Sequence, residues 1–210
     1  MPHRTGSPTP GVEWGAAIRP LRGQTESGDL YVVSPWRRGV VLAAIDGLGH
    51  GREAAAAART AGAAVEQEPD GDVLALLTRA HQAARRTRGA VMSIAALDTQ
   101  ADLLSWCGVG NVEAALLRCN GREILKRESL LLRAGVLGDR LPSIRVAVLP
   151  VSPGDILVFA TDGLRSSFVH ELGISGTAQR MAEEILGKHA TGMDDALVLV
   201  ARYIGGDPAP

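Results

Sequence analysis

The sequence contains few of the residues on which several common kinds of protein depend. Only two of its 210 residues are cysteines, Cys107 and Cys119, and neither belongs to a CxxC or Cys/His cluster, so no structural zinc site is expected. Two buried free thiols are the favoured state, with a single disulfide as the alternative. Aromatic residues make up 3% of the chain, and no basic patch accompanies the tryptophans, which argues against a base-stacking surface.

Long apolar runs and an excess of one charge are also missing. No apolar run approaches about 18 residues, so no membrane-spanning helix is predicted. Basic residues number 22 and acidic residues 23, for a net charge of −1, which gives no reason to expect nucleic acid or an anionic membrane as a partner. The nucleotide-binding patterns GxGxxG and GxxxxGK[ST] are absent as well.

The ends of the chain are polar. Residues 1–10 are rich in proline and lack the apolar stretch of a signal peptide, so we expect a disordered lead there. One domain is expected over residues 11–204, with a tail over 205–210 and a cytoplasmic location. Nothing in the sequence indicates an obligate interface, and a monomer is expected.

Apolar periodicity predicts more strands than helices. Helices are expected over residues 52–66, 72–86 and 177–189, the second capped by Asp72. Strands are expected over residues 12–18, 30–34, 39–45, 90–98, 102–107, 112–118, 123–126, 144–149, 156–160 and 196–203. Because these strands follow one another as hairpins, the chain is predicted to be an α+β protein with mostly antiparallel sheets covered by helices.

Aspartates beside glycines stand at the ends of the strongest predicted strands. Asp29 precedes one strand, Asp46 and Asp162 each follow one, and the pair Asp194 and Asp195 precedes the last. Each Asp-Gly pair alone is more typical of a turn than of a ligand site. If the strand ends converge, however, the carboxylates would repel one another unless cations neutralised them. Mg²⁺ or Mn²⁺ suits such an all-oxygen site, and two ions can activate a water and clamp a phosphoryl group.

The segments that carry these aspartates resemble the ordered motifs of PP2C-type metal-dependent serine/threonine phosphatases. The segments are Glu26-Ser27-Gly28-Asp29, Asp46-Gly47-Leu48-Gly49-His50-Gly51, Thr161-Asp162-Gly163-Leu164 and Asp194-Asp195-Ala196-Leu197-Val198. The second of them reads DGxGHG, as in the SpoIIE-like branch, and Gly108-Val109-Gly110-Asn111 stands where that branch has a Gly/Asn-rich turn. Because it shows no sensor segment, the chain resembles the short, RsbX-like members of the branch.

The resemblance implies an α-β-β-α sandwich and a centre of two Mn²⁺ or Mg²⁺ ions. Asp46 would bridge both ions, the Gly47 carbonyl and Asp29 would serve one, and Asp162 and Asp194 the other. A metal-bound water would attack the phosphorus in line. Asp194 is assigned ahead of Asp195 because the family places its ligand first in the pair. The implied substrates are phosphorylated STAS-domain proteins of partner-switching pathways and stressosomes, of the RsbS and RsbR kind.

The sequence also departs from the family pattern. Leu48 stands where animal and plant relatives have a histidine assigned as general acid, and His50, two residues further on, is expected to orient the loop. No secure match exists for the phosphate-binding arginine, for which Arg19 and Arg22 are the nearby candidates. A catalytically silent docking module is the alternative function, and a metal-dependent nuclease is disfavoured by the near-zero net charge.

Four arginines cluster around the end of the second predicted helix. They are Arg79, Arg85, Arg86 and Arg88. Basic residues at a helix C-terminus complement the helix dipole, so a solvated helix face is the favoured interpretation. A docking surface for an acidic protein partner is the sharper alternative.

Overall fold

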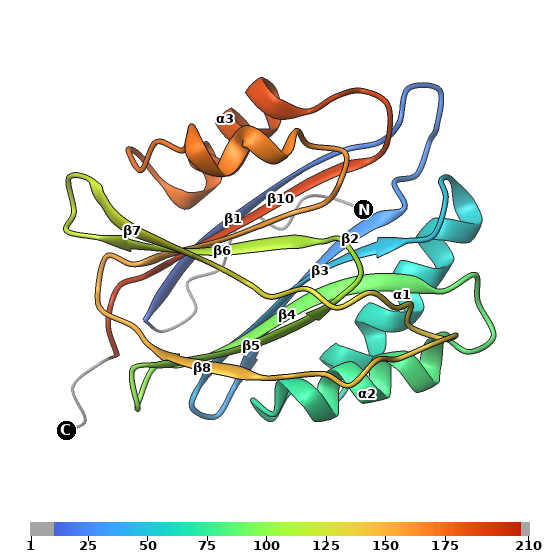
Figure 1. Ribbon diagram of the computed structural model, residues 1–210, viewed down its shortest axis with the longest axis horizontal. Helices are drawn as coiled ribbons and strands as arrows, with labels where there is room; N and C mark the ends of the chain where they lie inside the picture. The colour runs from blue at the N-terminus through green and yellow to red at the C-terminus, as the bar shows by residue number, and fades with distance from the viewer. Residues whose placement is uncertain (1–10, 207–210) are drawn as a thin grey trace.

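Two antiparallel β-sheets face each other at the centre of the protein (Figure 1). The computed structural model describes residues 11–206, so the expected N-terminal lead and residues 207–210 of the tail lie outside the described residues. One sheet consists, from edge to edge, of β1 (Val12–Arg19), β10 (Ala196–Tyr203), β9 (Ile156–Ala160), β6 (Glu113–Cys119) and β7 (Ile124–Ser129). The other consists of β2 (Asp29–Trp36), β3 (Gly39–Gly47), β4 (Ala90–Asp98), β5 (Leu103–Val109) and β8 (Ala147–Pro150).

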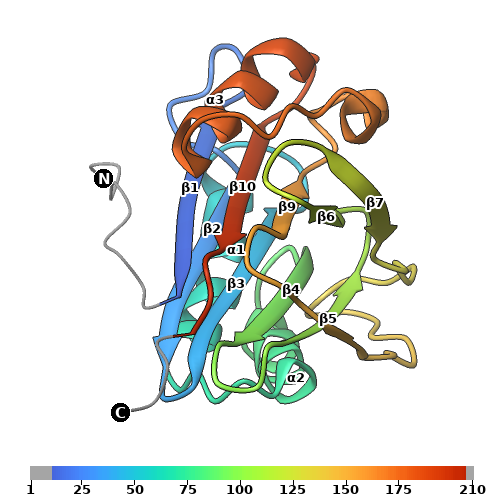
Figure 2. The same ribbon diagram turned by 90° about the vertical axis from the view of Figure 1, so that its left-hand side faces the viewer.

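Helices cover the outer faces of both sheets. Helices α1 (Arg52–Glu66) and α2 (Val73–Ala84) lie against the β2–β8 sheet, while α3 (Ala178–His189) and the short 3-10 helix η1 (Ser166–His170) cover the other (Figure 2). The expected cap forms, because the Asp72 carboxylate accepts hydrogen bonds from the amides of Leu74 and Ala75 at 3.0 Å. The predicted α-β-β-α sandwich is therefore confirmed.

Apolar side chains fill three layers, and successive side chains along a strand enter the layers on its two opposite faces. In β3, Leu42 and Ala44 enter the layer between the two sheets, whereas Ala43 and Ile45 enter the layer beneath α1 and α2. A third layer lies between α3 and the other sheet. A side-chain period of two makes β3 apolar on both faces, as the unbroken apolar run over residues 40–45 predicted.

The strands over residues 90–98, 156–160 and 196–203 have the predicted bounds, whereas the other seven differ from the prediction by one to three residues at an end. Two of these differences have a clear cause. The strand predicted over residues 144–149 is the shorter β8, because Ile144 packs against the layer beneath α2 instead of pairing along a sheet edge. The strand predicted from residue 102 begins at Leu103, because Asp102 adopts a positive φ of 54° in the preceding turn.

The sequence favoured free thiols over a disulfide and predicted no membrane-spanning helix. Both cysteines are free thiols, Cys107 buried and Cys119 half-buried. No helix between residues 11 and 206 has the length and apolar character needed to cross a membrane.

Candidate functional site

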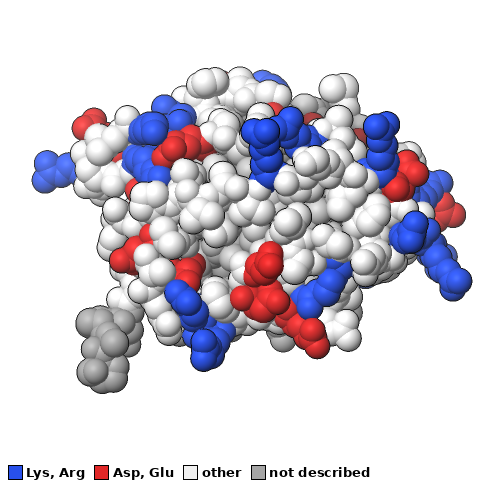
Figure 3. All heavy atoms as spheres, turned by 60° about the horizontal axis from the view of Figure 1, so that its bottom comes forward, with Lys and Arg blue, Asp and Glu red and all other residues white. Residues whose placement is uncertain are grey.

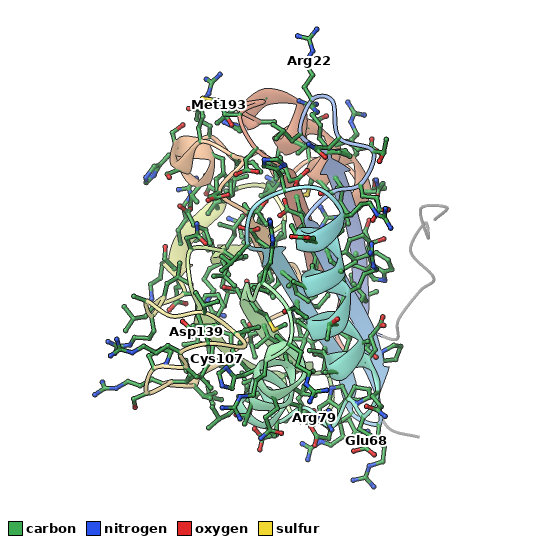
Figure 4. All side chains as sticks on the ribbon, turned by 90° about the vertical axis from the view of Figure 1, so that its right-hand side faces the viewer. Arg22, Glu68, Arg79, Cys107, Asp139 and Met193 are labelled. Atoms are coloured by element: carbon green, nitrogen blue, oxygen red, sulfur yellow. The ribbon has the colours of Figure 1, made fainter. Side chains whose placement is uncertain are left out.

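The ends of four strands bring acidic side chains to one end of the layer between the sheets. Asp29 begins β2 and lies directly opposite Asp46 of β3 in the strand register. Opposed residues share a face, and here it is the face that packs against the other sheet. Figure 4 looks onto this end of the molecule. Asp29 is 5% exposed, so two carboxylates stand side by side where the apolar layer ends.

The opposite sheet contributes Asp162, after β9, and Asp194, before β10. Both are exposed. Asn111 Nδ2 donates a 2.8 Å hydrogen bond to one oxygen of Asp162, and the Asp195 amide donates one of 2.8 Å to Asp194 Oδ1. Met193 beside them is 81% exposed and projects outward at the top of Figure 4, which leaves this turn open to solvent.

Asp195 has a different environment from its neighbour. Its side chain is 3% exposed, and its two oxygens accept hydrogen bonds from the amides of Leu21 and Gly28, both at 2.8 Å. Gly28 in turn accepts a 3.0 Å hydrogen bond from the Gly47 amide. Asp195 therefore fastens the loop of residues 20–28 to the end of β3, while Asp194 keeps a free oxygen facing solvent.

Burial and mutual repulsion perturb the acids of this cluster. Burial raises the pKa of Asp29 from 3.8 to about 8, and the charge of Asp46 adds to that rise. Burial, followed by the charges of Asp162 and Asp194, raises the pKa of Asp46 to about 7. Partial desolvation and the charge of Asp194 raise the pKa of Asp162, which the Asn111 hydrogen bond opposes. The groups around these carboxylates therefore do not compensate their negative charge when all of them are ionised.

Two glycines allow the backbone to approach closely around these acids. A Cβ on Gly47 would lie 2.0 Å from the Ala54 carbonyl oxygen in the first turn of α1. A Cβ on Gly163 would lie 1.9 Å from the Asp195 carbonyl oxygen. Since real Cβ atoms do not come this close, a larger residue at either position would push an acid-bearing strand end away from its neighbour.

The structure places the remaining predicted residues at the rim. His50 is exposed, and its Nδ1 accepts a hydrogen bond from Gln24 Nε2 at 3.3 Å, which ties two loops together. Leu48 is also exposed. Arg22 points away from the molecule into solvent at the top of Figure 4, and Arg19 is exposed, with no side-chain partner among residues 11–206.

Thr161 is the residue that sequence reasoning missed. It is 3% exposed, and its hydroxyl donates a hydrogen bond to Asp29 Oδ2 at 2.7 Å. Thr161 Oγ1 also accepts a hydrogen bond from the Leu197 amide at 2.8 Å. It therefore joins the Asp29 carboxylate of one sheet to the strands of the other. A buried threonine directly before Asp162 was the available signal, because a buried hydroxyl requires hydrogen-bond partners.

The donor set fits hard divalent cations. At least one carboxylate oxygen makes no hydrogen bond within residues 11–206 in each of Asp29, Asp46, Asp162 and Asp194. No three acidic, histidine or cysteine side chains in that range stand close enough together to hold one ion by themselves. Mg²⁺ and Mn²⁺ suit this arrangement, since Mg²⁺ typically keeps several waters and needs only one or two carboxylates.

Comparison with known proteins also indicates a phosphatase family. The family model "Stage II sporulation protein E (SpoIIE)" matches residues 37–204. The chain is 24% identical to phosphoserine phosphatase RsbX of Bacillus subtilis over 178 residues, covering 85% of this chain and 87% of RsbX.

Solved structures share the fold. A chain from work on the bacterial stressosome as a modular system controlling secondary messenger signalling has a TM-score of 0.82 and 28% identity, covering 91% of this chain and 99% of that one. RsbX in complex with magnesium has a TM-score of 0.80 and 22% identity, covering 91% and 94%. The sequence resemblance to PP2C-type phosphatases is thereby confirmed, and this chain belongs to their SpoIIE family.

Proposed function

We propose that this protein removes phosphate from phosphoserine and phosphothreonine in proteins, with Mn²⁺ or Mg²⁺ as cofactor. The observation that carries the proposal is the convergence of four acidic strand ends, two from each sheet, on one end of the inter-sheet layer. Buried carboxylates that raise one another's pKa are costly to a fold unless a cation binds there.

The two sheets suggest a division of roles among the acids. Asp46 interacts electrostatically with Asp29 of its own sheet and with Asp162 and Asp194 of the other, which suits a ligand shared by two ions. The Gly47 carbonyl and Asp29 would hold one ion, and Asp162 and Asp194 the other. Asp195 is committed to backbone amides and would act by positioning the loop of residues 20–28.

Bound divalent ions would supply positive charge that lowers the pKa of a water and neutralises phosphoryl oxygens. The protein's own contribution is orientation. Thr161 fixes one oxygen of Asp29, and Asn111 fixes one oxygen of Asp162, which leaves the other oxygen of each acid available to a cation. These two hydrogen bonds would orient the acids for a bound divalent cation.

Hydrolysis of para-nitrophenyl phosphate tests the proposal. We expect turnover with Mn²⁺ or Mg²⁺, none with EDTA, and at least a hundredfold loss in Asp46→Asn, in line with the loss of a group central to phosphoryl transfer. Asp70→Asn is the matched control, since Asp70 is exposed at the start of α2, where its side chain accepts only the Asp72 amide. Full activity of Asp46→Asn would refute the assignment.

A catalytically silent docking module is the alternative function, and the retained acids argue against it. The two are separated by measuring Mn²⁺ binding calorimetrically in parallel with turnover. Binding with turnover indicates an enzyme, and loss of both in Asp46→Asn places them at the same site. A protein that turns over neither para-nitrophenyl phosphate nor a phosphoprotein would be a docking module.

The proposed substrates are phosphorylated STAS-domain proteins of a stressosome or partner-switching pathway. Support comes from the similarity to RsbX and to the stressosome-related chain. We expect a serine-phosphorylated STAS-domain protein to be hydrolysed at least tenfold faster than phosphorylated casein at equal concentration. Equal rates on the two proteins would contradict the substrate assignment while leaving the phosphatase activity standing.

A further inference from the structure

Five arginines without counterions lie on two neighbouring segments, and we name them the arginine surface. Arg85 and Arg86 follow α2, whereas Arg133, Arg140 and Arg145 lie in the segment of residues 130–146 between β7 and β8. All but the half-buried Arg133 are exposed. Within residues 11–206 none of their side chains makes a hydrogen bond or ion pair, and the Arg133 Nε is buried without a partner.

The neighbouring arginines of α2 are already neutralised. Arg79 pairs with Glu68 at 3.2 Å, and Arg88 pairs with Glu53 at 2.5 Å. The sequence cluster at the end of α2 therefore divides into two paired and two unpaired members. The interpretation of a solvated helix face accounts for the first two, but it leaves Arg85 and Arg86 beside three further uncompensated arginines.

The two segments are packed against each other. The Gly138 amide donates to His81 Nδ1 of α2 at 3.1 Å, and a Cβ on Gly138 would lie 2.5 Å from the Ala84 carbonyl oxygen. The Val136 amide donates to the Arg140 carbonyl at 2.8 Å, closing a tight turn. The turn that carries Arg140 is thus fixed on the last turn of α2, immediately before Arg85.

The arginine surface also borders the candidate site. The Arg133 carbonyl accepts a 2.8 Å hydrogen bond from the Gly110 amide, and the next residue, Asn111, holds Asp162. On the other side, Ala90 bridges to Leu137 and pairs with Gly47.

The charge of this surface is a local feature. The chain as a whole has a net charge of −1, while residues 130–146 contain three arginines and a single acidic residue, Asp139. Figure 3 shows the α2 side of the molecule, where both basic and acidic groups lie along the margins. Uncompensated arginines of one sign favour an acidic partner, and they act mainly on association rate and specificity.

We propose that the arginine surface docks acidic residues flanking the phosphorylated residue of a protein substrate. The inference rests on the proposed phosphatase function, because it makes the surface an extension of the same site. An acidic protein segment is favoured over nucleic acid because these arginines are few and because residues 85–86 and 130–146 contain no aromatic residue on which bases could stack.

Three fluorescein-labelled phosphoserine peptides of equal length test the proposal, with acidic, neutral and basic flanks. Binding is measured by fluorescence anisotropy in EDTA, where no metal-dependent turnover occurs, at low and high salt. We expect the acidic peptide to bind about tenfold more tightly than the neutral one, with the difference shrinking as salt screens the charges.

The variant Arg86→Glu/Arg140→Glu should remove this preference and leave binding of the neutral peptide within twofold. The matched control is Arg122→Glu, since Arg122 is exposed and has no ion pair within residues 11–206, and it lies in the β6–β7 turn at the far end of the molecule. An unchanged preference in the double variant, or an equal loss in the control, would overturn the proposal. So would tighter binding of a single-stranded DNA 12-mer than of the acidic peptide.

Hydrolysis of para-nitrophenyl phosphate with Mn²⁺ is measured in parallel on the unmodified protein. Turnover without any peptide preference would refute the docking surface and retain the phosphatase. Absence of turnover on both para-nitrophenyl phosphate and a phosphoprotein would refute the phosphatase, while the anisotropy measurement in EDTA would still decide whether the surface selects acidic segments.

Discussion

Replacing Asp46 by asparagine is expected to make the metal-free protein more stable while it abolishes activity. Asparagine has nearly the same shape and carries no charge. Within residues 11–206 the Asp46 side chain makes no hydrogen bond that the change would break. What the substitution removes is a carboxylate whose burial, together with the charges of Asp162 and Asp194, opposes ionisation.

The magnitude follows from the pKa of Asp46. A rise from 3.8 to about 7, at about 1.4 kcal/mol per pKa unit, sets a ceiling of about 4 kcal/mol for the cost of ionising this group in the fold. Because the acids titrate together, part of that cost is shared with Asp29, and we expect a gain of about 2 kcal/mol from the single substitution. For a domain of this size that corresponds to a rise in Tm of about 4–8 °C.

The sign of the pH dependence is fixed by the direction of the shift. The folded protein holds the Asp46 proton more tightly than the unfolded chain. The contribution of protonated Asp46 to the free energy of unfolding is therefore fully present below pH 3.8 and is lost as the pH rises to about 7. The advantage of Asp46→Asn should therefore be absent near pH 3.5, grow between pH 4 and pH 7, and remain constant above that. Carboxylates that are ionised in both states do not produce this profile.

Thermal unfolding in EDTA, followed by circular dichroism between pH 4 and pH 8, measures the effect, with Asp70→Asn as control. Adding Mn²⁺ at one hundred times its Kd should stabilise the unmodified protein by about 2.7 kcal/mol and have a much smaller effect on the variant. If Asp46→Asn is no more stable than the unmodified protein at pH 8 in EDTA, the acids are not under mutual repulsion, and the argument for a cation fails.

Three further changes test how the acids are held. Asp195→Ala leaves the Leu21 and Gly28 amides without their acceptor, and urea unfolding should show a loss of about 3 kcal/mol. Thr161→Val keeps the shape but removes the donor to Asp29; it should cost about 2 kcal/mol and weaken Mn²⁺ binding measured by calorimetry, whereas unchanged binding would show that Asp29 needs no positioning. Burial raises the pKa of Cys107 to about 12, so 5,5′-dithiobis(2-nitrobenzoic acid) should react with Cys107 only as fast as the protein unfolds.

The sequence was sufficient to predict the architecture because its strands carry strong signals. The apolar run ending at Asp46 is long enough to be buried on both faces, and the alternation in its neighbours fixes which faces meet. The segment of residues 130–146 was harder to predict. Its isolated bridges, from Arg133 to Val109 and from Leu137 to Ala90, are long-range contacts that leave no periodic pattern.

The acids themselves could be found from their places at strand ends, but their supports could not. Thr161 and Asn111 are ordinary residues in the sequence, and their roles depend on which strands lie across the gap between the sheets. The unpaired state of Arg85 and Arg86 is likewise invisible locally, because the nearby Arg79 and Arg88 have counterions from other elements. Tertiary pairing decides which charges stay available.

The neighbouring aspartates before β10 show why alternation alone cannot select a ligand. Along β10, Leu197 and Leu199 enter the layer between the sheets, so the period of two also turns Asp195 toward it, and Asp195 is the buried member of the pair. Burial alone would favour Asp195 over Asp194 as the metal ligand. The loop of residues 20–28 supplies two amides that use both its oxygens, which leaves the exposed Asp194 as the carboxylate available to a cation. One aspartate can then bind while the other keeps the loop beside Asp29 and Asp46, and the functional assignment follows from which oxygens remain free.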